Sequence, residues 1–249
     1  MIVLKTEREI ALMREAGRIS AVALQLVGEA VEPGVTTAEL DRIAEKYIRS
    51  QGAKPNFKGY NGFPATACIS VNDQVIHGIP SKHTVVHAGD IVSVDLGAVF
   101  GGYHGDNAAT FAAGQISPEA QRLLDATEES LYEGIRAAKA GGRIGDISSA
   151  VQRYVEARGY SVVRQYVGHG VGASLHEAPE VPNFGTPGHG VRLLPGMTLA
   201  IEPMVNMGTE KVKVLPDGWT VLTADGALSA HFEKSIVVTA DGPQILTQV

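Results

Sequence analysis

The sequence contains a single cysteine, Cys68, so no disulfide can form within the chain. The same shortage excludes a structural zinc site built from several cysteine thiolates. A lone buried thiol most often serves packing, and we do not expect Cys68 to act as a nucleophile.

The sequence also lacks long runs of like charge and long apolar runs. The 21 basic and 27 acidic residues give a formal net charge of −6, and no long run of like charges marks a nucleic-acid-binding face. No apolar run is long enough to span a membrane, and the first residues lack the pattern of a signal peptide. We therefore expect a cytoplasmic protein that binds neither nucleic acid nor membrane.

Clear helix signals are present. Residues 7–30 place apolar side chains at steps of three and four, which predicts an amphipathic helix. Thr36 and Glu39 form a capping-box pattern before a second helix. Ser117, followed by proline, predicts the start of a third helix, and a fourth ends near Gly159. A short strand is expected over residues 66–71.

Residues 90–111 predict a β-hairpin, because apolar segments flank the pair Gly101-Gly102. If the turn is centred at Phe100-Gly101, Asp95 lies directly opposite Asp106 on the same face. Two carboxylates in an apolar hairpin repel each other and lose their hydration, unless they share a proton or hold a cation.

The same order of helices, glycines and strands recurs in the second half. The run from Gly89 to Asp95 matches the run from Gly196 to Glu202, 107 positions later. Glu202 is then equivalent to Asp95. We expect a second hairpin, with Glu202 on its first strand and Glu233 opposite it on the return strand, residues 229–238.

The repeat predicts a single α+β domain, residues 1–249, with halves of approximately 1–111 and 112–249. A pseudo-two-fold axis would relate the halves, whose antiparallel strands merge into one curved sheet with helices on its outer face. Four carboxylates would converge on the inner face, and two divalent cations would neutralise them.

Histidines extend this set. Glycines flank His169, which lets the backbone pass close to a ligand, and one imidazole with four carboxylates favours Mn, Fe or Co. His104 shares a strand face with Asp106 and is a candidate to support a ligand. Four further histidines are expected to be ordinary hydrogen-bonded core residues: His83, His87, His189 and His231.

Several motifs resemble those of the type I methionine aminopeptidases, and the resemblance extends from Glu7 to Thr239. The matching segments are Cys68 to Pro80, Tyr103 to Asp106, Gly168 to Gly172 with His176, Pro195 to Met204, and Asp217 to Trp219. The resemblance implies the pita-bread fold of the creatinase and aminopeptidase proteins. It also implies removal of an N-terminal methionine that precedes a small residue.

The family's site residues are implied at matching positions. The metal ligands would be Asp95, Asp106, His169, Glu202 and Glu233. Asp106 and Glu233 would bridge two divalent ions, for which Co, Mn, Fe, Ni and Zn are candidates. A hydroxide between these ions would attack the first peptide carbonyl, and Glu202 would relay the proton.

The resemblance also implies a substrate site. His77 and His176 would act in catalysis and contact the scissile amide, and five residues would form the methionine pocket: Tyr60, Phe63, Cys68, Leu175 and Trp219. The chain departs from frequent family residues at Gly97, Asn107, Ala108 and Leu175.

The implied substrate is the N-terminal peptide of nascent proteins. The ribosome exit region is a candidate contact, and a monomer is expected. One alternative is an Xaa-Pro aminopeptidase or dipeptidase of the same fold, and another is a catalytically silent binding module. The intact ligand set argues against the silent module. The 32 residues between His169 and Glu202 are too few for the helical insert of type II enzymes.

Overall fold

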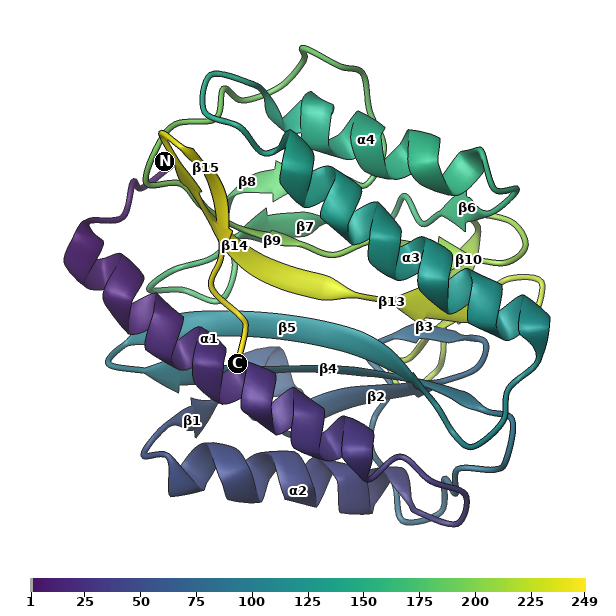
Figure 1. Cartoon of the computed structure of the whole chain (residues 1–249). Coiled ribbons are helices and arrows are strands. Elements are labelled where there is room, and N and C mark those ends of the chain that lie inside the picture. Colours follow the sequence, from purple (N-terminus) through teal and green to yellow (C-terminus); the bar gives the residue numbers. More distant parts are fainter. Residues whose placement is uncertain (1) are drawn as a thin grey trace.

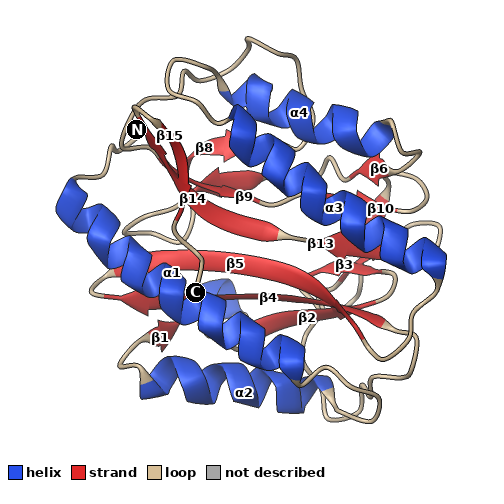
Figure 2. Ribbon diagram, viewed as in Figure 1, coloured by secondary structure: helices blue, strands red, loops and turns tan. Residues whose placement is uncertain are grey.

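The computed structural model describes residues 2–249, which form helices packed on one side of an antiparallel sheet (Figures 1 and 2). The helices are α1 (Glu7–Glu29), α2 (Thr37–Ser50), α3 (Pro118–Ala137), α4 (Ile144–Glu156) and the short 3-10 helix η1 (Tyr60–Gly62). The strands of the first half are β1 (Lys54–Pro55), β2 (Ala67–Val71), β3 (Gln74–Ile76), β4 (Ile91–Phe100) and β5 (Tyr103–Ala112). Those that follow are β6 (Ser161–Val162), β7 (Gly168–Gly170), β8 (Glu177–Val181), β9 (Thr198–Ile201), β10 (Met204–Asn206), β11 (Val212–Val214), β12 (Val221–Thr223), β13 (Ser229–His231), β14 (Glu233–Thr239) and β15 (Gly242–Ile245).

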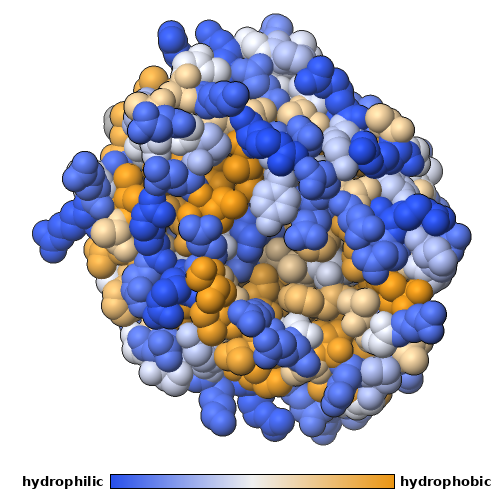
Figure 3. All heavy atoms as spheres, in the orientation of Figure 1, coloured by the Kyte–Doolittle hydropathy of each residue, from blue (hydrophilic) through white to orange (hydrophobic). Residues whose placement is uncertain are grey.

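The main sheet has nine strands in the order β1-β4-β5-β14-β9-β7-β8, with β2 beside β4 and β15 beside β14. Helices α1 and α2 cover one part of it, and α3 and α4 cover the other (Figure 1). Seen from the helix side, the surface mixes hydrophilic and hydrophobic residues (Figure 3). The curved antiparallel sheet with outer helices confirms the predicted fold. No helix within residues 2–249 is long and apolar enough to cross a membrane.

The predicted helix starts are confirmed. Thr6 and Thr36 each form a complete capping box, and the Ser117 hydroxyl accepts a hydrogen bond from the Ala120 amide. The apolar faces bury two large clusters, one beneath α1 and α2 and the other beneath α3 and α4. Gly17 of α1 lies so close to Gly105 of β5 that a Cβ on Gly105 would be 2.5 Å from the Gly17 nitrogen. Helix α1 thus sits directly on the strand that carries Asp106.

The predicted register of the first hairpin is wrong. Phe100 pairs with Tyr103, which places Asp95 opposite Ala108 and Asp106 opposite Gly97. The turn consists of Gly101 and Gly102, with φ of 57° and 86°, as in a type I′ turn, which needs positive φ at both positions. Asp95 and Asp106 still share a face, as diagonal neighbours.

The second hairpin forms with one interruption. Lys234 pairs with Ile201, and His231 pairs with Met204. Both pairs share one register, which places Glu233 opposite Glu202 as predicted. Glu202 nevertheless follows β9 instead of lying within it, and the expected return strand is split into β13 and β14. Pro203 lacks the N–H that a continuous ladder requires at this point.

Candidate active site

A cavity of about 190 Å³ lies on the side of the sheet away from the helices, since no residue of α1 to α4 lines it. It contains every metal ligand, catalytic histidine and methionine-pocket residue that the sequence implied. Its polar part is formed by Asp95, Asp106, His169, Glu202 and Glu233, with His77 and His176. Its other part is mostly apolar and is formed by Phe57, Tyr60, Asn61, Phe63, Cys68, Leu175 and Trp219.

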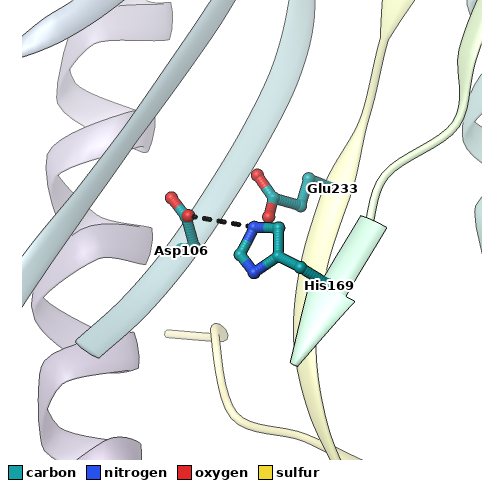
Figure 4. Close-up of side chains that lie close together, drawn as sticks. All are labelled: Asp106, His169 and Glu233. Atoms are coloured by element: carbon teal, nitrogen blue, oxygen red, sulfur yellow. Dashed lines mark ion pairs between the residues drawn. The ribbon is translucent and has the colours of Figure 1, made fainter. Parts of the chain in front are cut away.

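The polar part is centred on three buried side chains. Asp106, His169 and Glu233 offer ligand atoms that all lie within 4.8 Å of one another (Figure 4). The His169 Nε2 atom is 3.8 Å from the Asp106 Oδ2 atom and 3.5 Å from the Glu202 Oε1 atom. Asp95 and Glu202 line the same cavity outside this tightest group.

The pairing of β4, β5 and β14 explains how the carboxylates are spaced. Ala108 lies opposite Asp95 on one side and opposite Glu233 on the other. Its small, buried side chain therefore separates two acidic residues, which stand two strand spacings apart, about 10 Å. Asp106, two residues earlier on β5, shares this face. The departure at Ala108 thus leaves space among the carboxylates.

Asn107 points to the opposite face of β5. Its Oδ1 atom accepts a hydrogen bond of 2.8 Å from the Lys234 ammonium, which fastens β5 to β14. The Asp106 amide donates to the Ser235 hydroxyl across the same pair of strands. Asn107 therefore supports the strand pairing and does not enter the cavity.

His169 reaches the cavity because its neighbours are glycines. A Cβ on Gly168 would be 2.4 Å from the Ala200 oxygen, and one on Gly170 would be 2.4 Å from the Ala178 oxygen. Only glycine lets β7 lie this close to the adjacent backbone. The His169 Nδ1 atom is 2.8 Å from the Gly170 oxygen, which leaves Nε2 facing the carboxylates.

Burial dominates the electrostatics. It raises the pKa of Asp106 to about 7 and raises the pKa of Glu233 well above its usual range, where neighbouring carboxylates add to the effect. The pKa values of Asp95 and Glu202 are raised for the same two reasons. Burial, with His176 nearby, lowers the pKa of His169 to about 4, so this imidazole is neutral at neutral pH.

Several buried carboxylate oxygens have no hydrogen-bond partner within residues 2–249, namely Asp95 Oδ1, Asp106 Oδ1 and Glu233 Oε1. Such oxygens are costly to bury unless a cation or a proton satisfies them. Together with the neutral His169 they form an oxygen-rich set with one imidazole, which fits divalent cations such as Mn²⁺, Fe²⁺ or Co²⁺.

The apolar part is a packed aromatic pocket. Phe63, Cys68 and Leu175 are buried, and the rings of Phe63 and Trp219 meet edge to face with centroids 5.1 Å apart. Phe57 also lines the pocket and was not predicted, although it lies only three residues before Tyr60. The Tyr60 hydroxyl lies 2.8 Å from His176 Nδ1 and links the pocket to the polar part.

The other histidines behave differently from the prediction. His83, His87 and His189 are exposed, so their assignment to the core is wrong. His231 is buried, but its Nε2 atom has no hydrogen-bond partner in the described part of the chain and is 3.7 Å from Glu202 Oε2. Its position two residues before Glu233, on the same side of the chain, could have identified it. His104 does not line the cavity.

Comparisons with known proteins agree with this geometry. The model of metallopeptidase family M24 matches residues 11–240. The chain is 57% identical to a methionine aminopeptidase of Clostridium perfringens, and the match covers 100% of both chains. A crystal structure of methionine aminopeptidase from Thermotoga maritima superimposes with a TM-score of 0.99 at 47% identity, covering 100% of each chain. An Xaa-Pro dipeptidase of Bacillus anthracis is more distant: the TM-score is 0.79 at 25% identity, and the match covers 99% of this chain and 62% of that one.

Proposed function

The chain belongs to metallopeptidase family M24, and we propose that it removes the N-terminal methionine from peptides and nascent proteins whose second residue is small. The observation that carries this proposal is one cavity in which a carboxylate–imidazole cluster adjoins an aromatic pocket. The cluster suits hydrolysis of the first peptide bond, and the pocket suits an unbranched apolar side chain such as methionine.

We propose that the site holds two divalent ions. Asp106 and Glu233 would contact both, Asp95 would complete one, and His169 with Glu202 would complete the other. The four carboxylates would balance the charge of the two ions. When bound, such ions supply Lewis acidity and make a water molecule more acidic.

Glu202 is proposed to accept the proton of the attacking water and deliver it to the departing amine. Its position supports this role, because its carboxylate lies within the cavity beside His169. In the metal-free site, burial and the neighbouring Asp95 and Asp106 raise the pKa of Glu202.

His176 is proposed to stabilise the oxyanion. Its Nδ1 atom is engaged by Tyr60, and in the tautomer where the tyrosine donates this hydrogen bond, Nε2 carries a hydrogen that it can donate. One such donor typically contributes about 3–4 kcal/mol to transition-state stabilisation. Burial lowers the pKa of His77 to about 4, so we propose that the neutral ring orients the peptide nitrogen.

The metal-loaded protein should release methionine from peptides that begin Met-Ala or Met-Gly. It should spare peptides with a bulky second residue and Xaa-Pro dipeptides, as measured by chromatography of the released amino acid. Glu202→Gln is the matched control, because it keeps the shape of the side chain and removes the base. Faster cleavage of Xaa-Pro substrates would support the Xaa-Pro alternative, and peptide binding without any cleavage would support a silent binding module. Contact with the ribosome exit region and a monomeric state stay predictions.

A further inference from the structure

A buried lysine lies beneath the loop that carries two residues of the cavity. Lys5 is only 8% exposed, and its ammonium donates to Glu177 Oε2 at 2.5 Å and to the Val3 oxygen at 3.1 Å. Glu177 directly follows His176 and begins β8. Lys5 therefore connects the N-terminal segment to the chain beside the proposed oxyanion donor.

The loop of residues 172–177 is shaped around this ion pair. Glu177 uses its other oxygen, Oε1, to accept a hydrogen bond of 3.1 Å from the Ser174 amide. A Cβ on Gly172 would be 2.3 Å from Lys5 Cε, so the aliphatic stem of Lys5 fills the space that a side chain would need. The loop is thus held by both the charge and the stem of Lys5.

The same loop is tied to strands that carry proposed ligands. The His104 amide on β5 donates to the Gly172 oxygen at 2.9 Å, and Asp106 lies two residues further along β5. The Lys5 amide donates to the Gly196 oxygen at 2.7 Å, just before β9. The N-terminal segment therefore fixes the loop relative to both sides of the cluster.

We infer that the Lys5–Glu177 pair is a positioning device, which sets the distance of His176 and Leu175 from the metal cluster. Neither charged group lines the cavity, so the pair acts through the loop and not on the substrate. The two buried charges have lost their hydration, so each needs the other in a specific geometry. Loss of one partner leaves an unpaired buried charge, and the loop must move to bring that charge to water. This inference rests on the proposed role of His176.

The test compares four variants of the full-length, metal-loaded protein: Lys5→Met, Glu177→Gln, the double variant and Lys5→Arg. Small displacements of a catalytic group can reduce turnover by about 10- to 100-fold. We expect losses of this size in kcat for both single variants and for the double variant, with unchanged affinity for Mn²⁺. Lys5→Arg keeps the charge and should retain more activity. Arg122→Gln, which breaks the exposed pair with Glu119, is the control and should not change kcat.

The double variant also distinguishes an effect of the ion pair on the position of His176 from an effect on the stability of the fold. It leaves no unpaired buried charge, so it should unfold at a temperature close to that of the wild type even where the single variants do not fold. A double variant that folds and turns over at the wild-type rate would overturn the inference.

A second readout does not depend on turnover. In metal-free protein labelled with ¹⁵N-histidine, the ring resonances of His176 should shift in the double variant, while those of the exposed His87, in the first half of the chain, should not. Unchanged His176 resonances would also overturn the inference. If wild-type protein released no methionine, the proposed function would fail, whereas the ring resonances would still test the positioning of His176.

Discussion

Glu202 lies between two imidazoles. His169 Nε2 is 3.5 Å from its Oε1 atom, and His231 Nε2 is 3.7 Å from its Oε2 atom. His231 is 1% exposed, and burial lowers its pKa to about 3, so it is neutral and able to carry a hydrogen on Nε2. Because the described residues offer that atom no hydrogen-bond partner, its most direct use is to orient the nearby Glu202 carboxylate.

His231 should therefore contribute to metal binding through Glu202. Replacing it with leucine should weaken the binding of Mn²⁺ by about 10- to 100-fold, since groups that orient metal ligands commonly have effects of this size. His231→Gln keeps an N–H donor and should lose less. Isothermal titration calorimetry on metal-free protein measures both affinities. Equal Mn²⁺ affinity in the leucine variant and the wild type would show that His231 only fills space.

The site residues that lie within recognisable sequence motifs could be predicted. All the predicted ligands and pocket residues line the cavity, because each lies in a segment with a recognisable neighbourhood, such as the glycines around His169. Phe57 and His231 were missed or misassigned because their proximity to the site depends on how separate strands come together. The roles of the ligands stay a prediction.

Among the elements, the contact between α1 and β5 depends on Gly105. Its missing side chain allows the backbone of α1 at Gly17 to touch the strand that carries Asp106. A larger residue at Gly105 must push the helix away or displace the strand, whereas a Cβ on Gly17 would be 2.3 Å from the Leu246 oxygen. The packing of this helix and the geometry of the site are therefore linked.

Gly105→Ala should reduce the free energy of unfolding by about 3 kcal/mol, at the upper end of the usual cost of overpacking a core. Urea unfolding of the metal-free protein measures this change. Gly34→Ala is the control. Its φ is 100°, and no atom of residues 2–249 outside its immediate neighbours lies within 4 Å of the added Cβ, so it tests backbone strain alone at about 1 kcal/mol. If Gly105→Ala were no more destabilising than the control, the close packing of α1 on β5 would be unimportant.

In the first hairpin, the sequence pattern predicted the strands but not their register. The existence of β4 and β5 followed from their apolar residues and the two glycines. Their register depends on which two residues form the turn. The turn lies at Gly101-Gly102, one position after the predicted Phe100-Gly101, and this shift makes Ala108 the partner of Asp95 in place of Asp106. Alternation preserved the shared face, which is why the cavity was predicted despite the wrong pairing.

In the whole molecule, the two sets of strands join where β5 pairs with β14. Ala108 lies opposite Glu233 there, which brings acidic residues distant in sequence onto one face. The repeated order of elements predicted a merged sheet, but it contained no information on which strands form the junction. The division into halves at residue 111 stays a prediction.

This concentration of buried carboxylates makes the stability of the metal-free protein depend on pH. Asp106 has a pKa of about 7 in the folded state, against about 4 in an unfolded chain, and the pKa values of Glu233, Glu202 and Asp95 are also raised. The folded state therefore binds more protons than the unfolded state between these values. The stabilisation that protonated Asp106 contributes is fully present below a pH of about 4. It is lost as the pH rises through about 7.

We therefore expect the melting temperature of chelator-treated protein to fall from roughly pH 5 to pH 8, by an amount equivalent to at most about 4 kcal/mol for Asp106 alone. With saturating Mn²⁺ the slope should vanish or reverse, because cations replace the protons and protons compete with them at low pH. Asp106→Asn should make the metal-free curve less steep, since the amide does not titrate in this range while the other three carboxyl groups still do. A metal-free protein that became more stable with rising pH would contradict the raised pKa values and, with them, the view that the carboxylates need a cation at neutral pH.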